Sequence, residues 1–171
     1  MNFFEKLGFV KKTGKIKVKL DKSKGAILPT RAHAADAGLD LYTPVDIEVP
    51  IAVGTTRTFD GRPVHDYTDH SATIDTGVGF EIPFGYVGFI KSKSGIMCKS
   101  NVIAGEGVID SGYTGSVVVK LYNMGVKPKI FKAGDKIAQI VFLPCGLFEP
   151  EEVFELSETE RGENGFGSTG R

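Results

Sequence analysis

Residues 105–115 read Gly-Glu-Gly-Val-Ile-Asp-Ser-Gly-Tyr-Thr-Gly. The β-branched pair Val108 and Ile109 predicts a short strand, and the Asp-Ser-Gly that follows predicts a turn. Two strands around this turn would place Asp110 and Tyr113 together at the end of a hairpin. A carboxylate in such a position can orient water or take a proton from it, and a tyrosine ring can wall a small pocket. The same residues would also suit an ordinary hairpin with no chemistry.

Glycine and proline punctuate the rest of the chain in the same way. The 22 glycines and 8 prolines are dense enough to break up long helices. Several segments between them alternate apolar and polar residues, as half-buried strands do. We therefore predict an all-β fold of the sandwich or barrel type, with at most a short helical turn near residues 2–7 or 93–99. The predicted strands are Ile16–Leu20, Asp46–Val49, Ala72–Ile82, Tyr86–Lys91, Gly107–Ile109, Ser116–Asn123, Lys136–Leu143 and Val153–Leu156.

Length and composition narrow the class of protein. A chain of 171 residues suits one domain rather than two. No stretch approaches the roughly 20 apolar residues of a membrane-spanning helix, and the first residues lack the apolar core of a secretory signal. Two cysteines, Cys98 and Cys145, are too few for a disulfide scaffold. We expect a cytoplasmic protein with reduced thiols and no membrane partner.

Charge is balanced overall but not along the chain. The net charge of zero gives no global attraction for nucleic acid. Residues 1–24 carry a net charge of +6, and residues 148–171 carry a net charge of −5. These ends are either solvated separately or attract each other or a neighbouring subunit.

Two segments differ from the strand-rich remainder. Residues 54–71 are polar and contain an Asp-Gly turn signal, so they read as a long loop or an inserted hairpin, which are often functional. Residues 157–171 hold four glycines and a single apolar residue, Phe166. A segment of this composition cannot bury a core of its own, and we expect it to be mobile unless it docks elsewhere.

Four motifs contain residue types suited to phosphate chemistry, although each also fits an ordinary turn or edge strand. Residues 93–95 place a lysine, a serine and a glycine after a predicted strand. Asp40 alternates with two leucines, and Gln139 interrupts an apolar run in which a buried amide would need partners. In residues 161–170, glycines open the backbone to an anion, an arginine fork suits phosphate oxygens, and one aromatic ring offers a stacking face.

Taken in order, these motifs are specific. The series AGLDL (37–41), KSKSG (91–95), GVIDSGYTG (107–115), GDKIAQI (134–140) and RGENGFGSTG (161–170) resembles the five ordered motifs of the homotrimeric dUTPase family (dUTP diphosphatases). The resemblance implies a jelly-roll β-sandwich over residues 1–156, with the insert at about 54–71. It also implies a flexible arm over residues 157–171 that closes an active site formed by neighbouring subunits. Insertions of this kind suggest a phage origin.

The resemblance also implies a reaction and roles for residues. The expected reaction is hydrolysis of dUTP to dUMP and pyrophosphate. Asp110 is implied to activate the attacking water, and Tyr113 to pack on the deoxyribose and leave no room for a 2′-hydroxyl. Asp40 and Gln139 are implied to support phosphates, metal-bound waters or the attacking water. The other implied contacts are Lys93, Ser94 and Gly95 with the phosphate chain, the backbone of Ala104, Gly107, Val108 and Ile109 with uracil, and Arg161, Phe166, Gly167, Ser168 and Thr169 in the closing arm.

The implied cofactor is Mg²⁺, held by substrate phosphates and waters rather than by direct protein ligands, with Asp40 outside the inner shell. No dense carboxylate or histidine cluster contradicts this, since His33, His65 and His70 lack metal-ligand spacing. One departure concerns the second motif, in which the family usually has Pro and Arg at the positions of Ser92 and Lys93. Lysine keeps the charge but loses the bidentate fork.

Two alternatives remain open. A dCTP deaminase shares the family fold, but the position of its catalytic glutamate is occupied here by Lys120. A protein that binds or signals to a partner through insert 54–71 is the other, and it is compatible with catalysis. A nucleic-acid-binding module is disfavoured because the basic residues are confined to one segment without interleaved aromatics.

Overall fold

The structure is a computed structural model that describes residues 14–163. Within that range it is built of strands with one short α-helix, as predicted. The helix predicted near residues 2–7 lies outside the described residues. The elements are β1 (Lys17–Leu20), a 3₁₀ helix η1 (Lys22–Lys24), β2 (Gly38–Tyr42), β3 (Ile47–Val49), β4 (Gly54–Phe59), β5 (Arg62–Tyr67), β6 (Ser71–Asp75), β7 (Val78–Glu81), β8 (Tyr86–Lys91), α2 (Ser94–Ser100), β9 (Val102–Ala104), β10 (Gly107–Ile109), β11 (Val118–Asn123), β12 (Lys129–Phe131) and β13 (Lys136–Pro144).

A four-stranded antiparallel sheet in the order β10-β8-β13-β2 forms the centre of the fold. The longest strand, β13, pairs with β8 along Gln139–Pro144 and with β2 along Lys136–Val141. The register of β13 against β2 shifts between Lys136 and Ala138, which is a β-bulge. A bulge adds one residue to a strand and so changes which side chains share a face.

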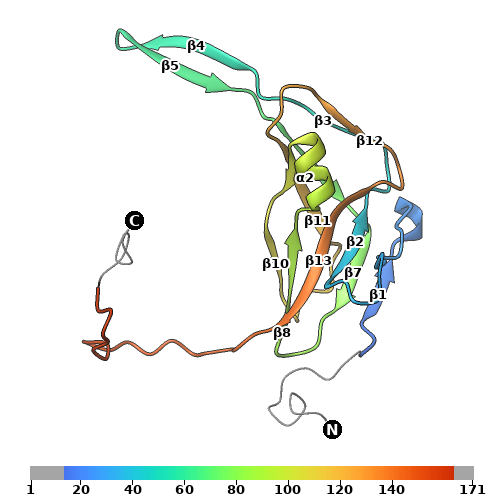
Figure 1. Cartoon of the computed structure of the whole chain (residues 1–171), viewed down its shortest axis with the longest axis vertical. Coiled ribbons are helices and arrows are strands. Elements are labelled where there is room, and N and C mark those ends of the chain that lie inside the picture. Colours follow the sequence, from blue (N-terminus) through green and yellow to red (C-terminus); the bar gives the residue numbers. More distant parts are fainter. Residues whose placement is uncertain (1–13, 164–171) are drawn as a thin grey trace.

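A second sheet in the order β6-β11-β9 lies in the body with the smaller pairs β1-β7 and β12-β3 (Figure 1). The core between these layers is apolar, as alternation along half-buried strands predicts. Its most deeply buried side chains include Leu41, Phe80, Ile90, Val119, Leu121, Ile137 and Ile140. Burial of this apolar area is the main force that holds the strand layers together.

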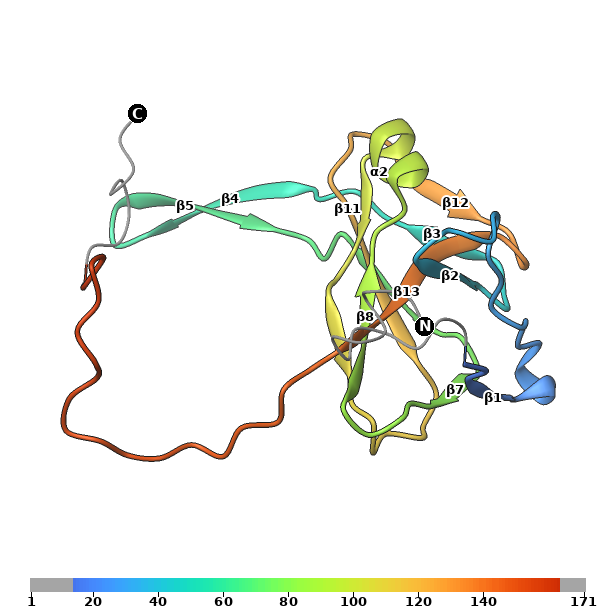
Figure 2. The same ribbon diagram turned by 60° about the horizontal axis from the view of Figure 1, so that its bottom comes forward.

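The insert forms a hairpin. β4 and β5 pair from Gly54↔Tyr67 to Phe59↔Arg62 and project from the body as a long ribbon (Figures 1 and 2). The two turn residues, Asp60 and Gly61, have φ values of 52° and 73°, which is the left-handed pair that tight hairpin turns require. Every residue of β4 is exposed. The hairpin alternative for this segment is therefore confirmed.

The chain leaves the body after Pro144 and extends away from it (Figures 1 and 2). The predicted strand Val153–Leu156 is wrong, because the structure places those residues in extended chain without a ladder. Apolar side chains are nevertheless frequent here, and Phe148, Phe154 and Leu156 are almost fully exposed. An isolated segment has no partner strand within one protomer, so apolar alternation alone does not make it a strand.

Two further sequence predictions are corrected. The segment Ala72–Ile82 is not one strand, because Gly77, with a φ of 67°, separates β6 from β7. The hairpin predicted around Asp110 is also wrong. β10 pairs with β8, whereas β11 pairs with β6 and β9, so Asp110 lies in a connection between two sheets. In the described range, no helix is long and apolar enough to cross a membrane.

Candidate active site

Asp40 is the buried charge of the central sheet. It lies on β2 opposite Gln139 of β13 and is only 5% exposed. Lys93 pairs with Oδ1 of this carboxylate, and Lys136 Nζ lies 2.7 Å from Oδ2. A buried carboxylate is tolerated only when it is paired. Asp40 is therefore a paired carboxylate inside the sheet and not a surface charge.

The bulge in β13 explains how three polar groups meet. Lys136 and Gln139 are three positions apart, so a regular strand would point them to opposite faces. The register shift between Lys136 and Ala138 adds the extra residue that lets Lys136 reach Asp40. Lys136 belongs to the GDKIAQI motif but is not among the predicted site residues, because a bulge is not visible in the strand pattern.

The two lysines decide the charge of Asp40. Burial alone would raise its pKa, but hydrogen bonds from Lys136 and Lys93 outweigh burial and hold the pKa of Asp40 below its ordinary value. The same hydrogen bond with Asp40 raises the pKa of Lys136. The cluster at neutral pH is thus one carboxylate between two ammonium groups, with excess positive charge suited to an anion.

Gln139 has the partner that its half-buried position requires. Its Nε2 donates a hydrogen bond to the carbonyl oxygen of Ser92 at 3.0 Å. Gly38 makes room for this amide, since a Cβ at residue 38 would lie 2.2 Å from Oε1 of Gln139. Gln139 therefore fixes the chain between β8 and α2, where the predicted phosphate-binding residues lie.

Those predicted residues lie at the start of α2. Lys93 is the N-terminal flanking residue of the helix and has no side-chain capping bond, because an ammonium carries no acceptor for a backbone N–H. Its ammonium instead donates to Asp40. Ser94 and Gly95 are exposed in the first turn. A hollow of about 580 Å³ adjoins them and includes Gly95, Lys99, Lys129 and Lys136 among its lining residues. Lysine side chains around an open hollow favour an anionic ligand.

The backbone of Ala104 is occupied within the protomer. Its N–H donates to Oγ of Ser92 at 3.0 Å, and the same hydroxyl donates to the carbonyl oxygen of Ala104 at 3.3 Å. Ala104 was predicted to read uracil together with Gly107, Val108 and Ile109. The latter three form β10, on the edge of the central sheet, and Val108 is 59% exposed.

Asp110 and Tyr113 lie in an exposed turn, closed by a hydrogen bond from Tyr113 N to the carbonyl oxygen of Asp110 at 3.0 Å. The Tyr113 hydroxyl donates to the carbonyl oxygen of Ser116 at 2.9 Å. Ser116 in turn donates to Asp75. Hydrogen bonds from Lys24 and Ser116 lower the pKa of Asp75 to about 2. A chain of polar contacts therefore fixes the ring of Tyr113.

The register separates the predicted site into two groups. Lys91, next to Ser92, pairs with Gln139, whereas Ile109, next to Asp110, pairs with Gly88. At about 3.3 Å per residue, the backbone of Asp110 is roughly 15 Å along β8 from that of Ser92. The structure brings Asp40, Lys93 and Gln139 together, and it does not bring Asp110 to them within one protomer.

The arm contributes one predicted residue to the described range. Arg161 lies in the exposed chain beyond the body, and Phe166, Gly167, Ser168 and Thr169 lie outside the described residues. Among residues 14–163, no group of three or more His, Cys, Asp and Glu side chains could hold a metal ion.

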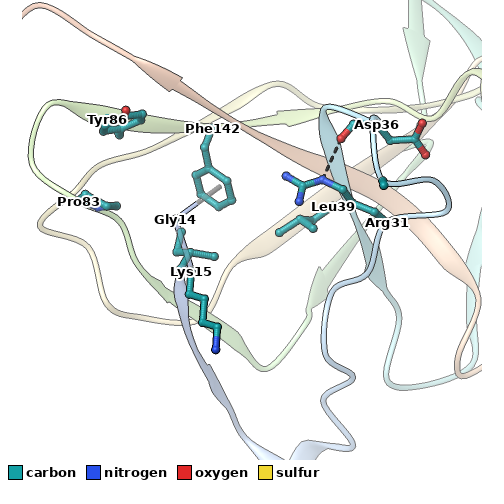
Figure 3. A pocket seen from close by; sticks show the side chains of 10 residues that line it. Gly14, Lys15, Arg31, Asp36, Leu39, Pro83, Tyr86 and Phe142 are labelled. Carbon is teal, nitrogen blue, oxygen red and sulfur yellow. Dashed lines mark hydrogen bonds between the residues drawn. The ribbon is translucent and has the colours of Figure 1, made fainter. Parts of the chain in front are cut away.

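A second hollow, of about 430 Å³, lies near the opposite end of β13 and contains none of the predicted site residues (Figure 3). The Phe142 ring points into it beside Leu39, and Arg31 closes one side through a 2.8 Å hydrogen bond to the carbonyl oxygen of Asp36.

An all-β body with lysines gathered at the start of α2, near the exposed edge strand β10, favours an anionic ligand. Comparison with known proteins gives the family. The dUTPase family model matches residues 24–170. The chain is 38% identical over 159 residues to the deoxyuridine 5′-triphosphate nucleotidohydrolase of Anaplasma marginale, covering 91% of this chain and 98% of that protein. The chain therefore belongs to the dUTPase family, as the order of its motifs predicted.

Solved structures support the same assignment. A mutant dUTPase of Staphylococcus bacteriophage 80alpha with dUpNHpp superposes with a TM-score of 0.73 at 28% identity, over 93% of this chain and 100% of that one. A mutant dUTPase from phage phi11 of S. aureus gives a TM-score of 0.68 at 25% identity, over 83% and 98% of the two chains. The latter structure is described as revealing the coordination of a structural Mg(II) ion.

Proposed function

We propose that this protein is a dUTP diphosphatase that hydrolyses dUTP to dUMP and pyrophosphate by attack of water at the α-phosphorus. The family assignment carries this function. In the proposed reaction, a water oxygen forms a bond to the α-phosphorus, the bond to the bridging oxygen breaks, and pyrophosphate leaves. Such a reaction depends mainly on positioning and on neutralising charge.

Two parts of the chain would share this work. Asp110 would orient the attacking water and accept its proton, and Tyr113 would pack on the sugar. Lys93, Ser94 and Gly95 would contact the phosphates, with the excess positive charge around Asp40 as the supporting observation. The exposed edge of β10 would read the base by its backbone, since a tight slot rejects the methyl group of thymine.

Mg²⁺ would be held by the substrate phosphates and water rather than directly by the protein. Both oxygens of Asp40 are engaged by lysines, so this carboxylate does not offer a free inner ligand. Mg²⁺ prefers phosphate oxygens and retained waters, and its contribution when bound is to neutralise charge on the triphosphate. The residues present fit a metal that arrives with the nucleotide.

We further propose that the active site is completed between copies of the chain, in a homotrimer. Asp110 and the phosphate-binding residues must contact one nucleotide, yet the register separates them by about 15 Å. The exposed apolar side chains of the segment that follows β13, Phe148, Phe154 and Leu156, support docking on a neighbouring copy, because large apolar side chains left in water are stabilised when another surface covers them. The arm, residues 157–171, would then close the neighbour's site.

The function is tested by measuring pyrophosphate release from dUTP, UTP, dTTP and dCTP with and without Mg²⁺. We expect release from dUTP alone, and only with the metal. Ammonia release from dCTP would instead indicate a deaminase. That alternative is disfavoured because Lys120, at the position of the deaminase acid, directs its Nζ over the ring of Tyr122 at 5.4 Å from the centroid.

The projecting hairpin favours a second function that is compatible with the first. β4 is exposed throughout, and Phe59 and Tyr67 are 68% and 69% exposed. We propose that this hairpin is a surface for a protein partner. Deletion of residues 54–67 is expected to leave dUTP turnover intact, and loss of turnover in a folded deletion variant would instead tie the hairpin to the active site.

A further inference from the structure

One side chain links the two halves of the nucleotide site inside each protomer. Ser92 lies between β8 and α2, directly before the predicted phosphate-binding residues. Its hydroxyl accepts a hydrogen bond from Ala104 N at 3.0 Å and donates one to the Ala104 carbonyl oxygen at 3.3 Å. A single serine hydroxyl thus engages both polar groups of one residue at the end of β9.

The position of Ala104 makes this contact consequential. β9 pairs with β11 on one side, with Ala104 opposite Leu121, and the next residue, Gly105, donates to the Lys120 carbonyl oxygen at 2.7 Å. The N–H and carbonyl of Ala104 point to the other side, where Ser92 takes the place of a neighbouring strand. Ala104 is 5% exposed, so its polar groups need partners within the protein.

Ser92 is itself held from the opposite direction. Its carbonyl oxygen accepts the 3.0 Å hydrogen bond from Nε2 of Gln139. Gln139 lies opposite Asp40, which pairs with Lys93. The chain of contacts therefore runs from the Asp40 cluster through Gln139 and Ser92 to the segment that leads into β10.

We propose that Ser92 is a positioning residue. By holding Ala104, it sets the place of the base-reading strand 107–109 that follows relative to the phosphate-binding residues 93–95. This inference rests on the proposed function, which gives those two segments their roles. The side chain does not need to touch the nucleotide.

The test compares Ser92→Ala with Ser92→Thr and with the wild-type protein. Alanine removes both hydrogen bonds and leaves a buried N–H and carbonyl unpaired, while threonine keeps the hydroxyl. A displacement of about 1 Å in a reacting site can reduce the rate on the order of 10²-fold. We expect Ser92→Ala to lower kcat/KM for dUTP by about 10- to 100-fold and to relax the preference for dUTP over dTTP, and Ser92→Thr to restore both.

A matched control is Ser71→Ala, which removes a serine hydroxyl bonded to Asp69 at 2.6 Å from β6, two strands from β9 in the same sheet. Its kinetics should equal those of the wild type. Wild-type selectivity in a folded Ser92→Ala variant would overturn the inference while leaving the proposed function intact. A loss of rate without a change in selectivity, unrescued by threonine, would also overturn it. A wild-type protein inactive on dUTP would overturn the proposed function and this inference together.

Discussion

The ammonium of Lys136 lies 2.7 Å from Oδ2 of Asp40, while Lys93 engages the other oxygen of the same buried carboxylate. One acid therefore restrains two cations at the edge of the phosphate-binding region. Because Lys136 neutralises Asp40 from one side, Lys93 is the lysine that can be released to a phosphate without leaving a buried charge unpaired.

This relationship predicts the effect of Lys136→Met. Lys93 would become the only partner of Asp40, so dUTP would have to break a stronger pair, and we expect KM for dUTP to rise several-fold. The free energy of unfolding should fall only slightly, because the Lys136 side chain is exposed and solvent screens its pair with Asp40. Steady-state kinetics and denaturant unfolding measure both quantities. The control is Lys17→Met, which breaks an exposed pair with Glu81. An unchanged KM for Lys136→Met would refute the idea that Lys136 frees Lys93 from Asp40.

Asp110→Asn tests the proposed base. The amide keeps the size of the side chain but cannot accept the proton of the attacking water, so turnover should fall by about 10²- to 10⁴-fold while nucleotide binding persists. Asp60→Asn provides the control, because Asp60 lies on the hairpin turn at a φ of 52° that asparagine also tolerates. Near-normal turnover by Asp110→Asn would remove Asp110 from the mechanism.

Tyr113→Ala tests selection of the sugar. The Tyr113 ring is 45% exposed and is fixed through its hydroxyl to Ser116. It would therefore form one side of the pocket that holds the sugar. Removing the ring opens space for a 2′-hydroxyl, and we expect the preference for dUTP over UTP to fall by about 10-fold or more. The ratio of kcat/KM values measures this, with Tyr67→Ala on the hairpin as the control. An unchanged ratio would assign sugar selection to another residue.

The lowered pKa of Asp75 should make the stability of the folded protein depend on pH in the acid range. The Asp75 pKa is about 2 in the folded protein and close to 4 when unfolded. A lowered folded-state pKa stabilises the protein above the unfolded value, and that contribution is lost as the pH falls from about 4 through 2. Thermal unfolding of Asp75→Asn should therefore depend less steeply on pH in this window than unfolding of the wild type. Parallel profiles would show that Asp75 does not contribute.

Local sequence signals predicted much of the fold, because turns and alternation are encoded by neighbouring residues. The Asp60-Gly61 turn and the strands around Val18 and Ile90 are examples. Which strands pair with one another was harder to predict from the sequence. Nothing in residues 105–115 indicates that β10 joins β8 rather than β11, since that choice depends on packing between distant segments.

The site was predictable to the extent that motif order identifies a family. Asp40, Lys93 and Gln139 were selected and lie together. Lys136 and Ser92 were not, because their roles depend on a bulge and on a contact across two strands. The apolar pattern of Val153–Leu156 led to a wrong strand, since a ladder needs a partner that one protomer does not supply.

In the proposed reaction, water attacks the α-phosphorus of dUTP in a site that reads uracil. The decisive experiment is hydrolysis in water enriched in ¹⁸O, followed by mass spectrometry of both products. Attack at the α-phosphorus would place one labelled oxygen in dUMP and none in pyrophosphate. Label in pyrophosphate, or no products from dUTP, would contradict it.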